Sequence, residues 1–540
     1  MPGWNIADVW EAIAEVQPDA PAQVQGDRRQ TWGDFDRRAD AVGRHLLGLA
    51  GAEHQAKVAQ YLYNCPEYLE SLYGTWKAGM VPVNTNYRYT DAELVYLWDN
   101  ADAVCVVFHG SFTATIERIR SQVPRVESWL WVDDGAGDCP EWATPYESVA
   151  GDTGGGRCEP PWGRDGDDIY MLYTGGTTGM PKGTMWRQDD LFAILNAGGL
   201  SSYDENGTLD DLKKVRQESG PGAKMIPCCP LMHGTGALTA FGTLNGGGCV
   251  ICLEQRSFDP VELFETTERE GANMLVIVGD AFAKPMLRTL DENPGRWDLS
   301  SVLAITSSGV MWSQPVKDGL LKHHPGMLLV DSLGSSEAVG MGSSTSMAGA
   351  AADTAKFALG PNAVVITDDN RLVEPGSGEI GRVGITGRVP IGYYKDPEKS
   401  AKTFPVIDGV RYSVPGDYAT VEADGSITLL GRGSVVINTG GEKVFPEEVE
   451  EAMKTFPGVR DAVAVGVPDE KFGEAVTGVV ELDPGASLDE GALIAHVKSQ
   501  LAAFKAPKHV VVVETIGRAP NAKVDYKRLK QLAAERVAVR

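Results

Sequence analysis

The stretch MLYTGGTTGMPKGTMW, residues 171–186, starts with a short apolar run and continues with glycines, threonines and a single lysine. The apolar run predicts a strand that ends at Tyr173, and Thr174 to Gly183 predict a turn with few side chains. Glycine lets the backbone curl so that successive N–H groups point inward and form an anion-binding nest. The threonine hydroxyls and the Lys182 ammonium add donors and one positive charge, which favours a polyphosphate as the occupant.

Two well-known nucleotide loops do not match this stretch. The Walker A loop requires G-x-x-x-x-G-K-[ST], whereas here Pro181 precedes Lys182 and a glycine follows it. The dinucleotide-binding G-x-G-x-x-G pattern is also absent from these residues. Taken by itself, the loop leaves an ordinary glycine-rich turn open as the alternative.

Length and charge limit the class of protein. The chain has 540 residues and 43% hydrophobic residues, which at about 100–200 residues per domain predicts two domains or more. A net charge of −25 and a pI near 4.8 argue against nucleic acid as a partner, because phosphate backbones require a basic surface. The acidic surface is typical of a soluble protein.

The N-terminal stretch MPGWNIADVWEAIAEV lacks the charged start and continuous apolar core of a secretory signal, and it predicts a short amphipathic helix. No apolar run approaches the roughly 20 residues of a membrane span. We therefore expect a cytoplasmic protein without a transmembrane segment. Peripheral membrane contact and a homo-oligomer stay open at this point.

The eight cysteines include one pair with metal-like spacing, Cys249 and Cys252, with Cys228, Cys229 and His233 upstream. A zinc site requires four such ligands on tight loops. The stretch CVIC instead predicts an apolar strand, in which positions i and i+3 point to opposite faces. We expect buried thiols here rather than a metal site.

Helical and strand patterns alternate along the first 430 residues, which predicts an α/β fold with helices packed on largely parallel sheets. Two segments interrupt the alternation: 151–168 is rich in Gly, Pro and Asp and predicts a surface linker, and 203–227 predicts a polar excursion from the core. The expected helices are 30–49, 66–79 and 91–100, and the expected strands are 57–63, 80–86, 103–108, 274–278 and 328–334.

After Gly431 the pattern changes to that of a compact α+β unit large enough to fold by itself. We place the boundary at 432–435. Helices are expected at 446–456 and 488–501, and strands at 462–467, 477–482 and 509–514.

The loop TGGTTGMPKG resembles the phosphate loop of the adenylate-forming superfamily, which comprises acyl-CoA synthetases, peptide-synthetase adenylation domains and luciferases. Further motifs of this superfamily follow in the same order and cover nearly the whole chain. The nearest likeness is to actinobacterial ligases of long-chain and steroid side-chain acids. The motifs are LMHGTG (231–236), DSLGSSE (331–337), GEIGRVGITGRVPIGYYKDPEKS (378–400), SVPGDY (413–418), GRGSVVINTGGEKVFPEEVE (431–450) and PNAKVDY (520–526).

The resemblance implies an ATP- and Mg²⁺-dependent carboxylic acid–CoA ligase. In this chemistry a carboxylate attacks the α-phosphorus of ATP and releases pyrophosphate, and the thiol of coenzyme A then displaces AMP from the acyl-adenylate. Such phosphoryl chemistry depends on positioning and charge neutralisation. The implied domains are 1–432, which binds ATP and acid, a hinge at 433–435, and a mobile C-terminal domain, 436–540, that carries a catalytic lysine. The implied acid is a medium- or long-chain fatty acid or a steroid side-chain acid.

The resemblance also implies roles for single residues. Lys523 matches the lysine that stabilises charge in the first half-reaction, and His233 matches the histidine between the acyl pocket and the thiol path. Glu337 matches the Mg²⁺-binding carboxylate, Asp417 the ribose-binding aspartate, and Arg432 an arginine that contacts the nucleotide near the hinge.

Further binding positions follow from the same motifs. Gly440 and Gly441 match glycines that line the pantetheine tunnel, and Gly309 with the small residues after Glu337 should border the acyl pocket. The remaining nucleotide-binding positions are Thr174, Gly175, Gly176, Thr177, Thr178, Gly179, Lys182, Ser308, Gly309, Asp331, Ser332, Leu333, Gly334, Ser335 and Ser336.

Four residues depart from the family's pattern. Leu333 replaces the aromatic residue beside the adenine, Ser434 replaces a hinge Asp or Lys, Asn438 replaces a lysine, and Ala522 replaces the glycine before Lys523. Three other functions stay open: an acyl-AMP ligase that loads a carrier protein, a luciferase-like oxidase and a non-catalytic nucleotide-binding relative.

Overall fold

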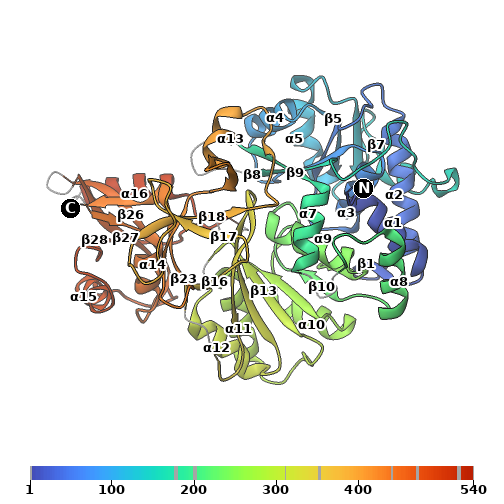
Figure 1. Cartoon of the computed structure of the whole chain (residues 1–540). Coiled ribbons are helices and arrows are strands. Elements are labelled where there is room, and N and C mark those ends of the chain that lie inside the picture. The colour runs from blue at the N-terminus through green and yellow to red at the C-terminus, as the bar shows by residue number, and fades with distance from the viewer. Residues whose placement is uncertain are drawn as a thin grey trace. The chain divides into compact units, whose positions relative to one another are not determined.

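The computed structural model describes residues 3–174, 180–198, 203–310, 312–350, 354–439, 442–469, 473–519 and 524–538 (Figure 1). The chain forms two compact units. Unit 1 comprises Met1–Gly340, Thr345–Ala351 and Thr386–Ser413, and unit 2 comprises Met341–Ser344, Ala352–Ile385 and Val414–Arg540.

Unit 1 contains an eight-stranded sheet with the strand order β19-β9-β8-β4-β3-β5-β6-β7. The strands from β8 to β7 are parallel, and β9 and β19 run antiparallel at one edge. Helices cover the parallel strands, which is why β5 reads as an unbroken apolar run. The strands are β3 (Lys57–Tyr61), β4 (Val81–Asn84), β5 (Ala103–His109), β6 (Ser128–Val132), β7 (Thr144–Pro145), β8 (Ile169–Thr174), β9 (Lys182–Arg187) and β19 (Gly392–Tyr393).

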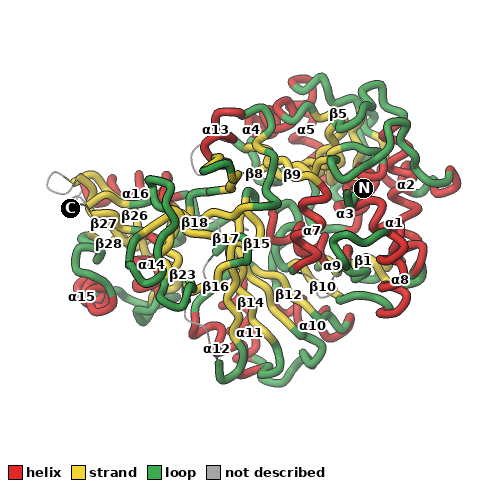
Figure 2. Tube along the Cα trace, viewed as in Figure 1, coloured by secondary structure: helices red, strands yellow, loops and turns green. Residues whose placement is uncertain are grey.

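A second set of strands in unit 1 has the order β2-β1-β11-β10-β12-β13-β14 and is parallel from β1 to β14. Figure 2 shows the strands in yellow beside the helices α10 (Pro260–Glu270), α11 (Asp280–Glu292) and α12 (Gln314–His323) in red. The strands are β1 (Pro21–Gln25), β2 (Arg28–Thr31), β10 (Lys224–Pro227), β11 (Cys249–Cys252), β12 (Met274–Ile277), β13 (Ala304–Ser308) and β14 (Leu328–Ser335).

The helices of unit 1 begin where the sequence provides caps. Before α2, the Thr31 hydroxyl accepts from the Asp34 N–H at 3.1 Å, and the Asp34 carboxylate accepts from the Thr31 N–H at 3.2 Å, which is a capping box. The helices are α1 (Ile6–Val16), α2 (Trp32–Leu47), α3 (Pro66–Lys77), α4 (Asp91–Asn100), α5 (Thr113–Ile119), α6 (Tyr146–Ala150), α7 (Gln188–Ala197), α8 (Leu209–Ser219), α9 (Gly234–Asn245), α10 (Pro260–Glu270), α11 (Asp280–Glu292), α12 (Gln314–His323) and α13 (Pro397–Thr403).

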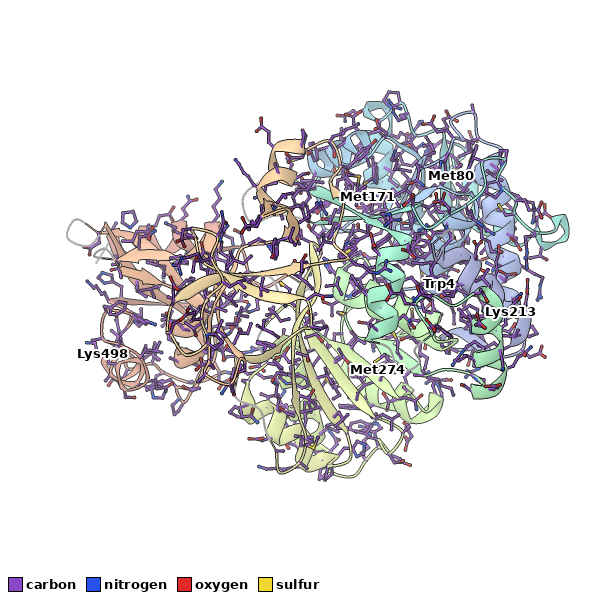
Figure 3. The ribbon with its side chains drawn as sticks, in the orientation of Figure 1. Trp4, Met80, Met171, Lys213, Met274 and Lys498 are labelled. Carbon is purple, nitrogen blue, oxygen red and sulfur yellow. The ribbon has the colours of Figure 1, made fainter. Side chains whose placement is uncertain are left out.

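These elements confirm the predicted helices and strands of unit 1. Aromatic residues fill much of the core: Trp10 of α1 and Trp76 of α3 are fully buried and meet edge to face at 5.5 Å. Met171 on β8 lies in the core of the eight-stranded sheet (Figure 3).

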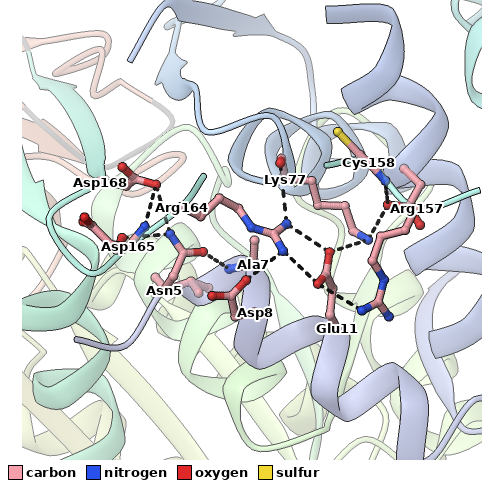
Figure 4. A network of polar contacts seen from close by, with 12 residues as sticks. Asn5, Ala7, Asp8, Glu11, Lys77, Arg157, Cys158, Arg164, Asp165 and Asp168 are labelled. Carbon is pink, nitrogen blue, oxygen red and sulfur yellow. Dashed lines mark hydrogen bonds and ion pairs between the residues drawn. The ribbon is translucent and has the colours of Figure 1, made fainter. Parts of the chain in front are cut away.

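The surface linker predicted at 151–168 is wrong in part, because this segment is anchored in unit 1. Cys158 is fully buried and Asp168 is 1% exposed. Arg164 binds both carboxylate oxygens of Glu11 on α1, at 3.0 and 2.9 Å (Figure 4). The partners lie more than a hundred positions away in the chain, so local composition could not reveal them.

The polar excursion predicted at 203–227 is also only partly correct. Residues Leu209–Ser219 form α8, a surface helix that packs on α1. Lys224–Pro227, however, form β10, which lies between β11 and β12 in the sheet. Tyr203 is buried as well, and its hydroxyl donates to the Asn245 carbonyl at 2.8 Å.

Unit 2 contains antiparallel strands and a separate five-stranded sheet of order β25-β24-β27-β26, with β28 beside β27. The antiparallel strands are β16 (Lys356–Leu359), β17 (Ala363–Ile366), β18 (Ile380–Thr386), β22 (Asp417–Val421) and β23 (Ile427–Arg432), and β15 (Ala338–Ser346) enters unit 2 at Met341. The five-stranded sheet comprises β24 (Ile437–Thr439), β25 (Glu442–Val444), β26 (Val459–Asp469), β27 (Gly473–Leu482) and β28 (His509–Val513).

Alternate residues of β26 supply two cores on the two faces of this sheet. Ala462 and Ala464 pack with α14 (Pro446–Lys454) and α15 (Glu490–Gln500), whereas Val463 and Val465 pack with α16 (Tyr526–Ala538). The predicted helices and strands of this region are confirmed, and α16 was missed. The domain boundary at 432–435 stays a prediction.

The predicted buried thiols are confirmed: Cys228, Cys229, Cys249 and Cys252 are each at most 9% exposed, and CVIC forms β11. Among the described residues, no helix is long and apolar enough to cross a membrane.

Candidate active site

The strands on either side of the glycine-rich loop pair with each other. Strands β8 and β9 pair antiparallel, and their register places Thr174 opposite Lys182. The Lys182 side chain is 35% exposed, and its Nζ lies 2.7 Å from Oδ2 of Asp396, one residue before α13. The predicted residues Gly175, Gly176, Thr177, Thr178 and Gly179 lie outside the described residues.

Glu337 and Ser336 lie between β14 and β15, and three side chains hold this turn. The Tyr393 hydroxyl donates to Glu337 Oε1 at 2.8 Å. The buried Trp186 indole donates to the Ser336 carbonyl at 2.8 Å, and the Ser413 hydroxyl donates to the Glu337 carbonyl at 2.6 Å. Trp186 lies on β9, the strand that begins with Lys182, and Tyr393 lies on its neighbour β19, so these two strands also fix the Glu337 turn.

Asn84 connects the glycine-rich loop to the segment that carries His233. The Asn84 amide exchanges hydrogen bonds with the backbone of Tyr173 and donates to the Met232 carbonyl at 2.7 Å. His233 occupies the N-cap position of α9, and its backbone N–H donates to the Pro230 carbonyl at 3.1 Å. Sequence reasoning missed Asn84, although a buried amide at the end of an apolar strand was a usable signal.

Gly309 lies beside the first turn of α9. A Cβ atom at Gly309 would lie 3.9 Å from Thr235 Oγ1, and one at Gly234 would lie 3.9 Å from Ser336 Oγ. Gly309 also has φ +92°, a conformation that favours glycine. The structure therefore brings together Gly309, α9 and the Glu337 turn within unit 1.

The residues of β14 alternate in burial. Asp331 and Leu333 are 6% and 8% exposed, whereas Ser332, Gly334 and Ser335 are half-buried, as is Ser308 at the end of β13. The Asp331 carboxylate lies 3.5 Å from the Lys317 Nζ of α12. Burial raises the pKa of Asp331 to about 6, although Lys317 lowers it in part.

Two predicted nucleotide residues lie in unit 2. The register of β22 and β23 places Asp417 opposite Arg432. Asp417 is 8% exposed. Adjacent antiparallel strands thus carry two of the residues that the resemblance assigns to the nucleotide. Gly440, Gly441 and Lys523 lie outside the described residues.

A hollow of about 650 Å³ elsewhere in unit 1 is a poor phosphate site, although four arginines line it. Arg28 pairs with Glu67, Arg29 with Glu270, Arg37 with Asp34, and Arg38 with Glu70 and Glu147. Because each guanidinium already has an acidic partner, the hollow offers an anion little net attraction.

Solved structures share this fold. The crystal structure of the anthranilate CoA ligase AuaEII with anthranoyl-AMP aligns over 100% of this chain and 99% of its own, at 20% identity and a TM-score of 0.83. ATP-bound MatB from Rhodopseudomonas palustris aligns over 99% of both chains, at 23% identity and a TM-score of 0.80. These likenesses confirm the predicted α/β fold with a large N-terminal and a small C-terminal part.

Family models and relatives cover the chain as well. The model of the AMP-binding enzyme matches residues 10–394, and that of the AMP-binding enzyme C-terminal domain matches 448–523. The medium/long-chain-fatty-acid–CoA/3-oxocholest-4-en-26-oate–CoA ligase of Mycolicibacterium smegmatis is 37% identical over 99% of this chain and 97% of its own. The 3-oxocholest-4-en-26-oate–CoA ligase of Rhodococcus rhodochrous is 38% identical over the same shares. The chain therefore belongs to the AMP-binding enzyme family, the adenylate-forming group that its motifs resemble.

Proposed function

We propose that this protein is an ATP- and Mg²⁺-dependent carboxylic acid–CoA ligase that acts through an acyl-adenylate. The observation that carries the proposal is the pairing of β9 with both β8 and β19. The first pairing sets Lys182 opposite Thr174 at the ends of the glycine-rich loop, and the second brings in Tyr393, which holds Glu337. Membership of the AMP-binding enzyme family and full-length similarity to acid–CoA ligases support the same conclusion.

The proposed acid is a medium- or long-chain fatty acid or a steroid side-chain acid. The named substrates of two relatives support this class. Gly309 has no side chain beside Thr235 in the first turn of α9, which is compatible with a bulky acyl group at that position. One methylene in such a pocket changes discrimination by only about 1–3 kcal/mol, so the pocket defines a class of acid rather than one compound.

The chain acts on the nucleotide by position and charge. Lys182 provides a compact ammonium suited to phosphate oxygens. Glu337 provides a carboxylate, the ligand type that Mg²⁺ prefers, and among the described residues its Oε2 has no hydrogen-bond donor. When bound, the ion supplies further positive charge to the phosphates. These residues therefore fit a magnesium nucleotide.

The second half of the proposal concerns residues 433–540. Lys523 stabilises charge between the carboxylate and the α-phosphate, and a rotation at 433–435 then replaces it with the face that forms the thioester. Hinge closure of this kind is absorbed by a few residues between rigid bodies. Gly440, Gly441 and His233 would line the path of the coenzyme A thiol.

The variant Lys523→Ala separates the two half-reactions. Adenylate formation, measured by pyrophosphate exchange, should be lost, while thioester formation from supplied acyl-AMP should persist. An equal loss of both steps would contradict this division of roles.

Mass spectrometry of one reaction mixture tests the function as a whole. The mixture holds the protein, ATP, Mg²⁺, coenzyme A and acids from acetate to C18 chains and steroid side-chain acids. Acyl-CoA and AMP as products support the ligase and identify the acid class. Acyl-AMP without thioester would favour a carrier-protein acceptor, and ADP as the only product would exclude adenylation.

A further inference from the structure

One short element, β19 with α13, contacts both charged side chains of the candidate site. The Tyr393 hydroxyl donates to Glu337 Oε1 at 2.8 Å, and the Asp396 carboxylate binds Lys182 Nζ at 2.7 Å. Lys182 Nζ also lies 5.8 Å from the centre of the Tyr393 ring. A single tyrosine therefore contacts the ammonium that meets phosphate and the carboxylate that meets the metal ion.

The surroundings fix Tyr393 in place. The Tyr393 backbone N–H donates to Ser400 Oγ at 2.8 Å, and the Ser400 hydroxyl in turn donates to the Asp396 carbonyl at 2.6 Å. The ring of Phe404 packs against that of Tyr393 with 5.6 Å between the ring centres, and Tyr393 is 7% exposed. A buried and hydrogen-bonded tyrosine of this kind keeps one rotamer, so its hydroxyl stays aimed at Glu337.

The chemistry of the donor matters as well. A phenol donates a hydrogen bond but carries no charge, so it orients the Glu337 carboxylate without neutralising it. An arginine or lysine at Tyr393 would cancel the negative charge on which cation binding depends. The bond occupies Oε1 and leaves Oε2 without a donor among the described residues. The carboxylate is thus ordered before a ligand arrives, which lowers the entropic cost of binding.

We propose that Tyr393 is a positioning residue that presets the Glu337 carboxylate for the nucleotide-bound cation. This inference rests on the proposed function, because it assumes that ATP binds with a divalent ion at Glu337. It assigns no chemical step to Tyr393. The hydroxyl acts only through Glu337, so its loss should affect the part of ATP binding that depends on Mg²⁺.

The neighbouring residue provides a matched control. The Tyr394 hydroxyl also donates to a carboxylate at 2.8 Å, but that carboxylate belongs to Asp102, the residue before β5. Its ring lies near Lys57 and Lys395 rather than Lys182. Tyr393→Phe and Tyr394→Phe therefore each remove one phenol–carboxylate bond at adjacent positions of the chain, and only Tyr393→Phe removes a bond to Glu337.

The experiment is calorimetric titration of ATP into the full chain, without acid or coenzyme A, in Mg²⁺ and in EDTA. Tyr393→Phe should weaken ATP binding about tenfold in Mg²⁺, the value of one hydrogen bond to a charged group, and leave binding in EDTA unchanged. Tyr394→Phe should change neither. Ser400→Ala, which keeps the phenol but removes its backbone anchor, should show a smaller loss in Mg²⁺ only.

Two outcomes would overturn the inference. One is an equal loss with and without Mg²⁺ in Tyr393→Phe, which would indicate a general structural role. The other is an undiminished effect of Tyr393→Phe in a Glu337→Gln background, because a positioning residue has nothing to position there. If the unaltered protein itself shows no Mg²⁺-dependent ATP binding, the proposed function fails rather than this assignment.

Discussion

Lys77 and Lys182 lie in the same unit of the molecule, yet they differ in burial and in the number of carboxylates that surround the ammonium group. Lys77 is fully buried, and its Nζ lies 3.0 Å from Glu11, 2.8 Å from Asp36 and 2.7 Å from Asp40. The Lys182 side chain is 35% exposed and pairs with the carboxylate of Asp396, which is itself 32% exposed.

The difference separates a structural charge from one that is available to a ligand. The three carboxylate partners of Lys77 lie on α1 and α2, and Lys77 itself lies on α3. A phosphate could therefore replace one of these partners only if the three helices moved apart. Lys182 can exchange Asp396 for a phosphate at little cost, because both side chains are partly exposed and a solvent-accessible ion pair contributes about 0–1 kcal/mol.

Removing the buried charge should have the largest effect. Lys77→Met leaves three carboxylates without their common partner in the interior, and the expected loss is about 3–5 kcal/mol in the free energy of unfolding. Urea unfolding followed by circular dichroism measures it. A loss below about 1 kcal/mol would mean that the carboxylates find protons or other partners, and the contrast with Lys182 would disappear.

The matching change at the exposed lysine should leave stability intact and reduce catalysis. Lys182→Met is expected to slow adenylate formation about a hundredfold, which is the usual cost of removing one donor to a developing anionic charge. Pyrophosphate exchange measures this rate, and the urea midpoint should match that of the unaltered protein. A shifted midpoint with a normal rate would reverse the roles given to the two lysines.

Acid should distinguish two carboxyls around Lys77. Burial alone would raise the pKa of Glu11, but Lys77 and Arg164 outweigh it and hold the pKa below its ordinary value. Its stabilisation is therefore complete above the ordinary glutamate pKa of 4.5 and is lost as the pH falls through its lower pKa in the folded protein. Burial raises the pKa of Asp36 despite Lys77, so Asp36 gives the opposite slope and adds stability as pH falls.

Unfolding curves at several pH values between 3 and 6 check these signs. Glu11→Gln should flatten the loss of stability on acidification, and Asp36→Asn should steepen it. Identical slopes in both variants would show that the two carboxyls titrate as one group rather than with opposite signs.

The smallest effect is expected at the partner of the exposed lysine. Asp396→Asn should change the free energy of unfolding by no more than about 1 kcal/mol, as for other surface ion pairs. Because the phosphates then meet a lysine without a competing carboxylate, ATP should bind slightly more tightly. Thermal unfolding and ATP titration measure the two quantities, and a large loss of stability would place Asp396 with the structural charges.

The sequence predicted the elements of the fold well where a pattern is local. The capped, helical spacing of 30–49 and the apolar run of β5 each reflect interactions within a few residues or one sheet. The contacts that build the site are not local. Tyr393 and Glu337 are 56 positions apart, and Lys182 and Asp396 are 214 apart. No single motif contains both partners, so resemblance indicated Lys182 and Glu337 but not what holds them.

Segment 151–168 is likewise held by contacts with residues far away in the chain. Its Gly, Pro and Asp content is typical of a surface linker, and the turns that this content favours are present. What buries the segment is the set of partners outside it, such as Glu11 for Arg164 and His54 for Asp168, which binds at 2.7 Å. The composition of a segment predicts its backbone turns, but it does not predict which charged residues elsewhere in the chain will bind its side chains.

The burial of the cysteines has a consequence for sulfur chemistry. Seven of the eight thiols are buried and Cys139 is partly buried. Burial raises the pKa of Cys229 and of Cys249 to about 12. Only the thiolate attacks a disulfide or an alkylating reagent, so these groups are almost inert near neutral pH. In a protein proposed to work with a free thiol as substrate, this keeps oxidised coenzyme A from forming mixed disulfides with the protein's own sulfur.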